Sequence, residues 1–500
     1  MSDLILSIDQ GTTSSRAIIF DTRGHSVATS QQEFKQYYPA SGWVEHDPEE
    51  IWSSTQAVCK QVLSKVDEVR VIGITNQRET VVVWNRENGQ AIHNAIVWQD
   101  TRTADQCAAL KQRKLEDKVR QKTGLVIDPY FSATKIAWIL DHVKGAREMA
   151  EQGKLAFGTI DSFLIWRLTE GKAHVTDATN ASRTLLFNIH TQQWDEELLE
   201  IFGIPASMLP DVQDSAAEFG ISSKSALGIE IPIGGVAGDQ QAAAIGQSCF
   251  LPGTIKSTYG TGGFALINTG DAVVSSQAGL LSTVAYRIKG HTTYALEGSI
   301  FIAGAAVQWL RDRLKIIQDS SQTESHARQL ASNDGVFLVP AFVGLGAPYW
   351  NPNARGAIFG LTRDTGPEHF SRAALESIAY QTYDLIQAMS KDTHYAIDTL
   401  RVDGGMVANR WMCQMLADIL SIDIEVPVVT ETTALGAAYL AGLQAGLFDS
   451  TEAISKLWLK AQTYSPQMDP ELRSQLLEQW KLAVSSVDNM GNASTAAGTN

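Results

Sequence analysis

The sequence predicts an α/β protein made of two related domains with a ligand cleft between them. Runs typical of buried strands alternate with amphipathic helical segments along the chain. A Gly-Thr turn between two apolar runs occurs twice, at Gly11 and at Gly260, about one domain-length apart. The chain has 500 residues, which is too long for one hydrophobic core. These observations together favour a duplicated architecture.

The first of these turns has the composition of a phosphate site. The apolar run Leu4–Asp9 leads into Gly11 and small hydroxyl residues, and a second apolar run follows, which predicts a β-hairpin. Backbone N–H groups and hydroxyls of such a turn can converge on an anion, and Asp9 could reach a hydrated Mg²⁺ on the phosphates. An ordinary polar turn has the same composition. The repeat at 256–267 favours a nucleotide held by both turns.

Composition limits the partners and the compartment. Hydrophobic residues at 44% and charged residues at 19% are typical of a globular protein, and a net charge of −15 disfavours nucleic acid. The four cysteines include no C-x-x-C pair, which indicates buried thiols rather than a zinc or disulfide framework. No basic leader follows Met1, and no apolar run approaches the ~20 residues of a membrane span. We expect a cytoplasmic protein without an integral membrane segment.

The first half is expected to begin with the hairpin and to alternate strands with helices thereafter. Asp47 can cap a helix whose first residue is Pro48. The further strands are expected at 26–32, 70–74, 95–98 and 231–239, and the helices at 49–64, from after 102 to about 121, at 132–140 and at 240–246. Because ligands collect beyond the carboxyl ends of strands in α/β sheets, Arg78, Glu79 and Asp239 are candidate site residues.

The second half repeats the alternation from a boundary near residue 250. We expect an N-terminal domain at 1–248, a C-terminal domain at 249–484 and a disordered tail at 485–500, which is polar and of low complexity. Strands are expected at 335–341 and 400–403, and helices at 298–314, 367–389, 412–420 and 434–442. The last helix consists of small residues, which predicts tight packing against another element.

Several common catalytic motifs are absent from the sequence. No Gly-Lys pair is followed by Ser or Thr as in a P-loop, and neither H-E-x-x-H nor G-x-S-x-G occurs. The Gly344-x-Gly346 turn lacks the third glycine of a dinucleotide fingerprint. A nucleotide would therefore have to bind through the paired hairpins.

The charged candidates admit two interpretations each. Asp239 is the best candidate general base, because a carboxylate at a Gly-rich strand end can reach a substrate hydroxyl, but an aspartate here could equally cap the helix that follows. Arg78 and Glu79 could clamp polyol hydroxyls, with the arginine donating and the glutamate accepting, or form a solvated surface ion pair. Residue type and spacing leave both interpretations open.

The aromatic and glycine candidates are equally ambiguous. Trp98, Tyr130 and Phe264 could face a small ligand, although aromatic residues most often belong to the core. Gly405 and Asn409 could form a nucleotide platform at a helix N-terminus, or simply a turn and a helix start.

Five segments together carry a resemblance to a known family. They are Asp9–Arg16, Gly42–Pro48, Gly73–Thr80, Gly238–Ala243 and Ala341–Trp350. With these segments the chain resembles the FGGY family of carbohydrate kinases, in particular its glycerol-phosphorylating members, over roughly residues 4–480. The two family signatures also occur, around 130–140 and from 357 to 376.

The resemblance implies an actin-like, ribonuclease H-like fold with ATP and substrate in the cleft between two duplicated domains. It also implies a homo-oligomer, dimer or tetramer. The residues implied for the nucleotide are Thr12, Thr13, Ser14, Arg16, Thr261, Gly304, Gln308, Gly405 and Asn409. Those implied for glycerol are Arg78, Glu79, Trp98, Tyr130, Asp239, Gln240 and Phe264. Mg²⁺ would be carried mainly by the phosphates, with Asp9 and Asp239 nearby through water.

The expected activity is ATP-dependent phosphorylation of glycerol to sn-glycerol 3-phosphate, with Asp239 as general base in an in-line transfer. Two alternatives remain. A sister FGGY kinase for a ketose or another polyol would keep both hairpins and change the pocket. An actin-like or chaperone-like ATPase would share the first turn without needing Arg78 and Glu79.

Overall fold

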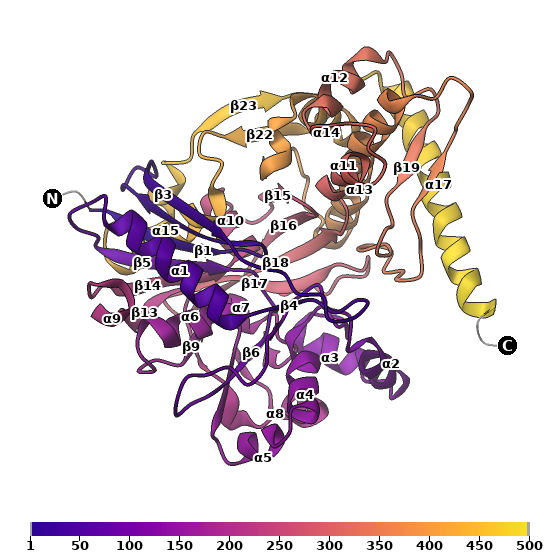
Figure 1. Cartoon of the computed structure of the whole chain (residues 1–500). Coiled ribbons are helices and arrows are strands. Elements are labelled where there is room, and N and C mark those ends of the chain that lie inside the picture. Colours follow the sequence, from indigo (N-terminus) through magenta and orange to yellow (C-terminus); the bar gives the residue numbers. More distant parts are fainter. Residues whose placement is uncertain (1–2, 498–500) are drawn as a thin grey trace.

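The computed structural model describes residues 3–497, and its main strands form two sheets, one in each half of the chain (Figure 1). The six-stranded sheet has the order β13-β14-β5-β1-β2-β3 and the seven-stranded sheet the order β17-β18-β16-β15-β21-β22-β23. The first sheet contains β1 (Ile5–Gln10), β2 (Ser14–Phe20), β3 (Ser26–Glu33), β5 (Val71–Asn76), β13 (Ala216–Ile221) and β14 (Pro232–Gly238). The second contains β15 (Ile255–Tyr259), β16 (Gly263–Gly270), β17 (Leu281–Ile288), β18 (His291–Ile300), β21 (Thr399–Asp403), β22 (Asp423–Pro427) and β23 (Lys460–Tyr464).

The two sheets repeat one strand pattern. In the first, β1 pairs antiparallel with β2, β2 pairs antiparallel with β3, and β1, β5 and β14 run parallel. In the second, β15 pairs antiparallel with β16, β16 pairs antiparallel with β18, and β15, β21 and β22 run parallel. This duplication confirms the actin-like, ribonuclease H-like fold, and both predicted hairpins form.

Short two-stranded sheets and helices complete the fold. The short strands are β4 (Glu45–His46), β6 (Val82–Asn85), β7 (Ala95–Ile96), β8 (Leu155–Gly158), β9 (Val175–Asp177), β10 (Phe187–Asn188), β11 (Gln193–Trp194), β12 (Asp211–Gln213), β19 (Phe337–Val339) and β20 (Ala357–Phe359). The helices of the first half are α1 (Pro48–Leu63), α2 (Ala104–Gln112), α3 (Glu116–Thr123), α4 (Ser132–His142), α5 (Ala146–Glu151), α6 (Ile160–Leu168), α7 (Ala178–Ala181), α8 (Glu196–Phe202), η1 (Ala206–Met208), α9 (Lys224–Leu227) and α10 (Asp239–Gly246). Those of the second half are α11 (Gly304–Asp312), α12 (Gln322–Gln329), α13 (Pro367–Thr393), η2 (Gly405–Ala408), α14 (Arg410–Leu420), α15 (Thr432–Gln444), α16 (Thr451–Ser455) and α17 (Pro470–Ala497).

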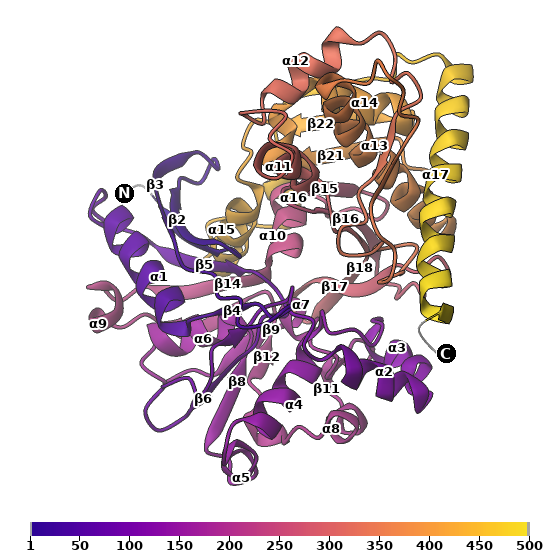
Figure 2. The same cartoon turned by 45° about the vertical axis from the view of Figure 1, so that its right-hand side comes forward.

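Helix α15 belongs to the second half of the chain but covers the sheet of the first. Helices α1 and α6 pack on one face of that sheet, and α10 and α15 pack on the other, at the centre of the molecule (Figures 1 and 2). A Cβ at Gly436 would lie only 1.8 Å from the carbonyl oxygen of Ala242, and one at Gly73 only 2.2 Å from that of Ala437. The expected tight packing of the small-residue helix is confirmed. The domain boundary after residue 248 stays a prediction.

The first helix of the chain starts as its sequence predicts. The Asp47 side chain accepts a hydrogen bond from the backbone N–H of Glu49 at 2.8 Å, and Pro48 is the first helical residue. No helix within residues 3–497 is long and apolar enough to cross a membrane.

Two predicted helices have different bounds in the structure. The helix expected up to residue 121 is two helices, because Lys114 adopts a left-handed conformation with φ 58° and breaks the run. The helix expected at 298–314 begins only at Gly304, because Gly298 belongs to β18, where it pairs with Ala265. A Cβ at Gly298 would lie 2.7 Å from Leu385, so this small residue allows close packing of a strand.

The disordered tail predicted from residue 485 is wrong as far as residue 497. Helix α17 continues through this stretch, along one edge of the second half (Figure 2). Trp480, Val484 and Val487 are buried at helical spacing in the core of the second half. This apolar face stabilises the helix despite the polar composition of the tail. Residues 498–500 lie outside the described part of the chain.

Candidate active site

Arg78, Glu79 and Asp239 follow two of three parallel strands that end at one edge of the first sheet. The register aligns Gln10 of β1 with Asn76 of β5, and Asn76 with Gly238 of β14. The loop after β5 and the start of α10 therefore leave the sheet side by side, and they bring Arg78 and Asp239 together.

Arg78 lies at the centre of a buried charge cluster. Its Nε lies 3.1 Å from Oδ1 of Asp239, while Nη1 and Nη2 donate to the two carboxylate oxygens of Glu297 at 2.5 and 2.8 Å. Glu79 accepts a 2.5 Å hydrogen bond from Nε of Arg183. Arg78 and Glu79 are only 3% and 1% exposed, so the alternative of a solvated surface pair is wrong.

The cluster changes the acidity of its carboxylates in opposite directions. Burial raises the pKa of Asp239 above its usual range, although Arg78 and Lys256 oppose the shift. Burial acts in the same way on Glu297, but Arg183 and Arg78 together lower its pKa to about 2. Glu297 therefore stays ionised, whereas Asp239, whose side chain is 34% exposed, has the properties of a proton acceptor that a ligand can reach.

Asp239 keeps one carboxylate oxygen available. It is the first residue of α10, and Gly238 occupies the N-cap position, so the alternative of a capping aspartate is wrong. Its Oδ1 accepts from the backbone N–H of Gln240 at 2.7 Å, while Oδ2 accepts no hydrogen bond from the described residues. The Gln240 side chain is held by buried Lys256, whose Nζ lies 2.5 Å from Oε1.

The three aromatic candidates meet beside this cluster. The ring of Trp98 lies edge-on to Tyr130 at a centroid distance of 5.7 Å and to Phe264 at 6.2 Å. All three side chains are half-buried rather than part of the core. Trp98 also donates from Nε1 to Oγ1 of Thr12 at 3.0 Å. We call these three rings the aromatic wall, and we call the turns at Gly11 and Gly260, which are predicted to bind phosphate, the first and second phosphate turns. The hydrogen bond from Trp98 joins the aromatic wall directly to the first phosphate turn.

In the first phosphate turn, Arg16 already has two acidic partners. Its Nη2 donates to Oδ2 of Asp9 at 2.7 Å and its Nη1 lies 2.5 Å from Glu431. Thr13 is exposed at the tip, and the Ser14 hydroxyl accepts a hydrogen bond from Gln31. Thr13 is thus open to a ligand, while Arg16 would have to share its donors with one.

The second phosphate turn packs against the start of α11. Thr261 is exposed, and its carbonyl oxygen accepts from the N–H groups of Ala303 and Ala305. A Cβ at Gly304 would lie 2.5 Å from the carbonyl oxygen of Gly260, so only glycine permits this approach. Gln308 is exposed one turn further along α11. Thr261 and Gln308 thus present exposed polar side chains near the N-terminus of α11.

The remaining two nucleotide candidates lie at the end of β21. Gly405 is exposed, and a Cβ placed on it would meet no atom within 4 Å. Asn409 caps α14, because its side chain accepts from the N–H of Met412 at 2.9 Å. Met406 lies beside Gly304, since it is the nearest side chain to a Cβ placed there. The segment containing Gly405 therefore adjoins the second phosphate turn.

The groups at this edge that could hold a metal ion are single carboxylate oxygens. Among residues 3–497, no group of three or more His, Cys, Asp or Glu side chains is arranged to hold a metal ion. Oδ1 of Asp9 and Oδ2 of Asp239 accept no hydrogen bond from the described residues. Carboxylate oxygens suit Mg²⁺, which usually keeps several waters and binds through one or two carboxylates and substrate phosphates.

Comparison with protein families decides the relationship. The N-terminal domain model of the FGGY family of carbohydrate kinases matches residues 4–246 and its C-terminal domain model matches residues 255–445. The chain belongs to the FGGY family of carbohydrate kinases.

Similar family members share nearly the whole length of the chain. A glycerol kinase from Ectopseudomonas mendocina is 59% identical over 98% of this chain and 100% of its own length. A glycerol kinase from Alcanivorax borkumensis is 58% identical over 97% and 98% of the two chains. A solved structure, the glycerol kinase of Plasmodium falciparum with ADP, superposes with a TM-score of 0.91 at 38% identity and covers 97% of this chain and 98% of that one.

In this member of the FGGY family, the structure adds residues to the candidate site that the sequence did not single out. Glu297 and Arg183 complete the charge cluster, and Gln77 braces the first turn by donating to the Gly11 carbonyl oxygen at 3.0 Å. Glu297 lies in the middle of a strand without a motif around it. Arg183 has only the polar residues around it, such as Asn180 and Ser182, as a local signal.

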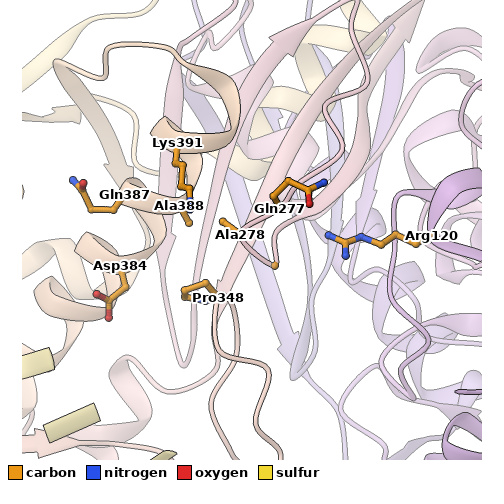
Figure 3. Close-up of a pocket in the computed structure, with 9 residues that line it drawn as sticks. Arg120, Gln277, Ala278, Pro348, Asp384, Gln387, Ala388 and Lys391 are labelled. Carbon is orange, nitrogen blue, oxygen red and sulfur yellow. The ribbon is translucent and has the colours of Figure 1, made fainter. Parts of the chain in front are cut away.

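A separate hollow of about 710 Å³ lies away from these residues. Figure 3 shows Arg120 of α3 on one side of it and Asp384 and Lys391 of α13 on the other. None of the predicted site residues lines it.

Proposed function

We propose that the protein transfers the γ-phosphoryl group of ATP to glycerol, forming sn-glycerol 3-phosphate and ADP in glycerol catabolism. The observation that carries the proposal is the meeting of Arg78, Glu79 and Asp239 beside an aromatic wall, at the strand ends between two phosphate turns. The relatives of nearly full length that are named glycerol kinases support the same substrate.

Substrate binding would use the polar groups of the cluster. Glu79 gives one oxygen to Arg183 and keeps the other for a substrate hydroxyl. The donors of Arg78 already have protein partners, so Arg78 would share one of them with the substrate. The rings of Trp98 and Phe264 would lie against the carbon chain. A triol held in this way would keep one terminal hydroxyl for the reaction.

The transfer would then proceed in line. Asp239 accepts the proton of the terminal hydroxyl, the oxygen bonds to the γ-phosphorus, and the bond from that phosphorus to the bridging oxygen of ADP breaks. The turns at Thr12 and Thr261, with Gly304, Gln308 and Gly405, would hold the polyphosphate and the rest of the nucleotide. Closure of the halves would exclude water as a competing acceptor.

Mg²⁺ fits the free carboxylate oxygens of Asp9 and Asp239, which would hold it through water. When bound with ATP, it neutralises charge on the phosphates. We further propose a cytoplasmic homo-oligomer, dimer or tetramer, that does not bind nucleic acid. Four buried free cysteines and the net charge of −15 support the compartment and the lack of a polyanionic partner.

An ADP-release assay with purified protein, ATP and Mg²⁺ tests this function. Glycerol, xylulose, ribulose and no acceptor are compared at equal concentration. We expect release to depend on glycerol. Preference for a ketose would indicate a sister kinase, and acceptor-independent release would indicate an ATPase, so either result would overturn the proposal.

A further inference from the structure

Two charged side chains that no solvent reaches lie behind the proposed substrate residues. Arg183 follows α7 in the first half, and Glu297 lies in β18 of the second half. Both side chains are 0% exposed. Neither side chain can touch a ligand, so any effect on the reaction would have to pass through other residues.

Their contacts form one chain of alternating charges. Both oxygens of Glu297 accept from Arg78, and Oε1 also accepts from Nη2 of Arg183 at 3.2 Å. Arg183 donates in turn to Glu79. The order is therefore Asp239, Arg78, Glu297, Arg183 and Glu79, and the three proposed substrate residues occupy both ends and one inner position.

We propose that Glu297 and Arg183 are positioning residues, which hold Arg78 and Glu79 in the geometry that accepts the substrate hydroxyls. The inference rests on the proposed function. The guanidinium of Arg78 is held at both terminal nitrogens, so its Nε stays directed at Asp239. The guanidinium of Arg183 also lies 5.5 Å from the centre of the Tyr130 ring, and so supports part of the aromatic wall.

Stability alone does not account for this arrangement. Burying the four charges of Arg78, Glu79, Arg183 and Glu297 costs desolvation energy, and replacing buried ion pairs by apolar side chains is often neutral or stabilising. Strand β18, which carries Glu297, pairs with β16, and Ser299 of β18 lies opposite Phe264 of β16. The strand that carries Glu297 therefore also fixes the position of Phe264. The second half of the chain thus shapes a site whose charged substrate-binding residues belong to the first half.

Steady-state kinetics of Glu297→Gln test the proposal. We expect the KM for glycerol to rise at least about tenfold, the scale of a lost charged hydrogen bond, while the KM for ATP changes less than about twofold. Glu376→Gln is the matched control, because Glu376 is an equally buried carboxylate that pairs with Arg372 at 2.7 Å outside the site. It should leave both KM values unchanged. Glu297→Asp should restore part of the glycerol affinity.

The split between the two KM values is a readout that a merely structural role would not give, because a general loosening of the fold would weaken glycerol and ATP binding alike. If Glu297→Gln does not fold, Arg183→Lys takes its place and should raise the glycerol KM in the same selective way.

The outcomes separate the two proposals. A wild-type protein without glycerol-dependent ADP release would overturn the proposed function. If the wild type is active and a folded Glu297→Gln or Arg183→Lys protein keeps the wild-type glycerol KM, or loses glycerol and ATP affinity alike, the positioning role is wrong.

Discussion

Asp239 shows how one side chain acquires a role from its surroundings. As a strand-terminal aspartate it could be a cap or a base. The structure gives the cap position to Gly238 and leaves Oδ2 of Asp239 without a partner among the described residues. Burial raises its pKa, so it binds a proton more readily than an exposed aspartate.

Asp239→Asn should keep the fold and glycerol binding but reduce turnover by roughly 10²-fold or more, because the amide cannot accept the proton. Initial rates of ADP release and calorimetric titration with glycerol measure the two effects. Near-normal turnover would remove Asp239 from the role of base.

The acid limb of kcat/KM should lie above the ordinary aspartate pKa of 3.8. The sign follows from the raised pKa: the base works only when ionised, and ionisation is lost as the pH falls through this raised value. A profile measured from acid to neutral pH tests this. The limb should be absent from the residual activity of Asp239→Asn, and its persistence there would point to another group.

Helix α15 shows how an element can join two halves of a chain. Its small residues predict close packing but do not say against what. The structure places it on the first sheet and α10, with the Ser7 hydroxyl donating to the Ala434 carbonyl oxygen at 2.6 Å. This contact joins residues 427 positions apart.

Gly436→Ala should destabilise the protein by roughly 1–3 kcal/mol, because the added methyl would overlap the backbone of α10. Urea unfolding followed by circular dichroism measures the change. Thr433→Ala, at a half-exposed position of the same helix, is the control and should stay within about 0.5 kcal/mol. An unchanged midpoint for Gly436→Ala would show that the two helices can separate at little cost.

At the scale of the molecule, the proposed substrate site belongs to both halves. Arg78 binds Glu297 across 219 residues, and Trp98 of the first half meets Phe264 of the second. A ligand bound at this site would therefore stabilise both halves of the chain against unfolding, and not one domain alone.

Glycerol at about one hundred times its Kd should therefore stabilise the folded protein by about 2.7 kcal/mol and raise the midpoint of one cooperative transition. Scanning calorimetry measures this, and sucrose at equal concentration controls for the general effect of polyols. Two transitions of which only one responds would contradict a site shared by both halves.

The sequence by itself determined the features that depend on neighbouring residues. The two hairpins, the capped start of α1 and the placement of Arg78 and Asp239 beyond strand ends could be predicted, because turn chemistry and periodicity act over a few residues. The family resemblance extended this to the nucleotide side, where the contacts of Thr261 and Gly405 with a ligand stay predictions.

Only the tertiary structure decided which distant groups share an environment. Glu297 carries no local signal. The sequence around Gly298 predicts the start of a helix, whereas in the structure Gly298 lies in β18, which pairs with β16. The tail is helical because Val484 and Val487 pack in the hydrophobic core of the second half. Charge pairing and burial depend on residues hundreds of positions apart, and no local propensity reports them.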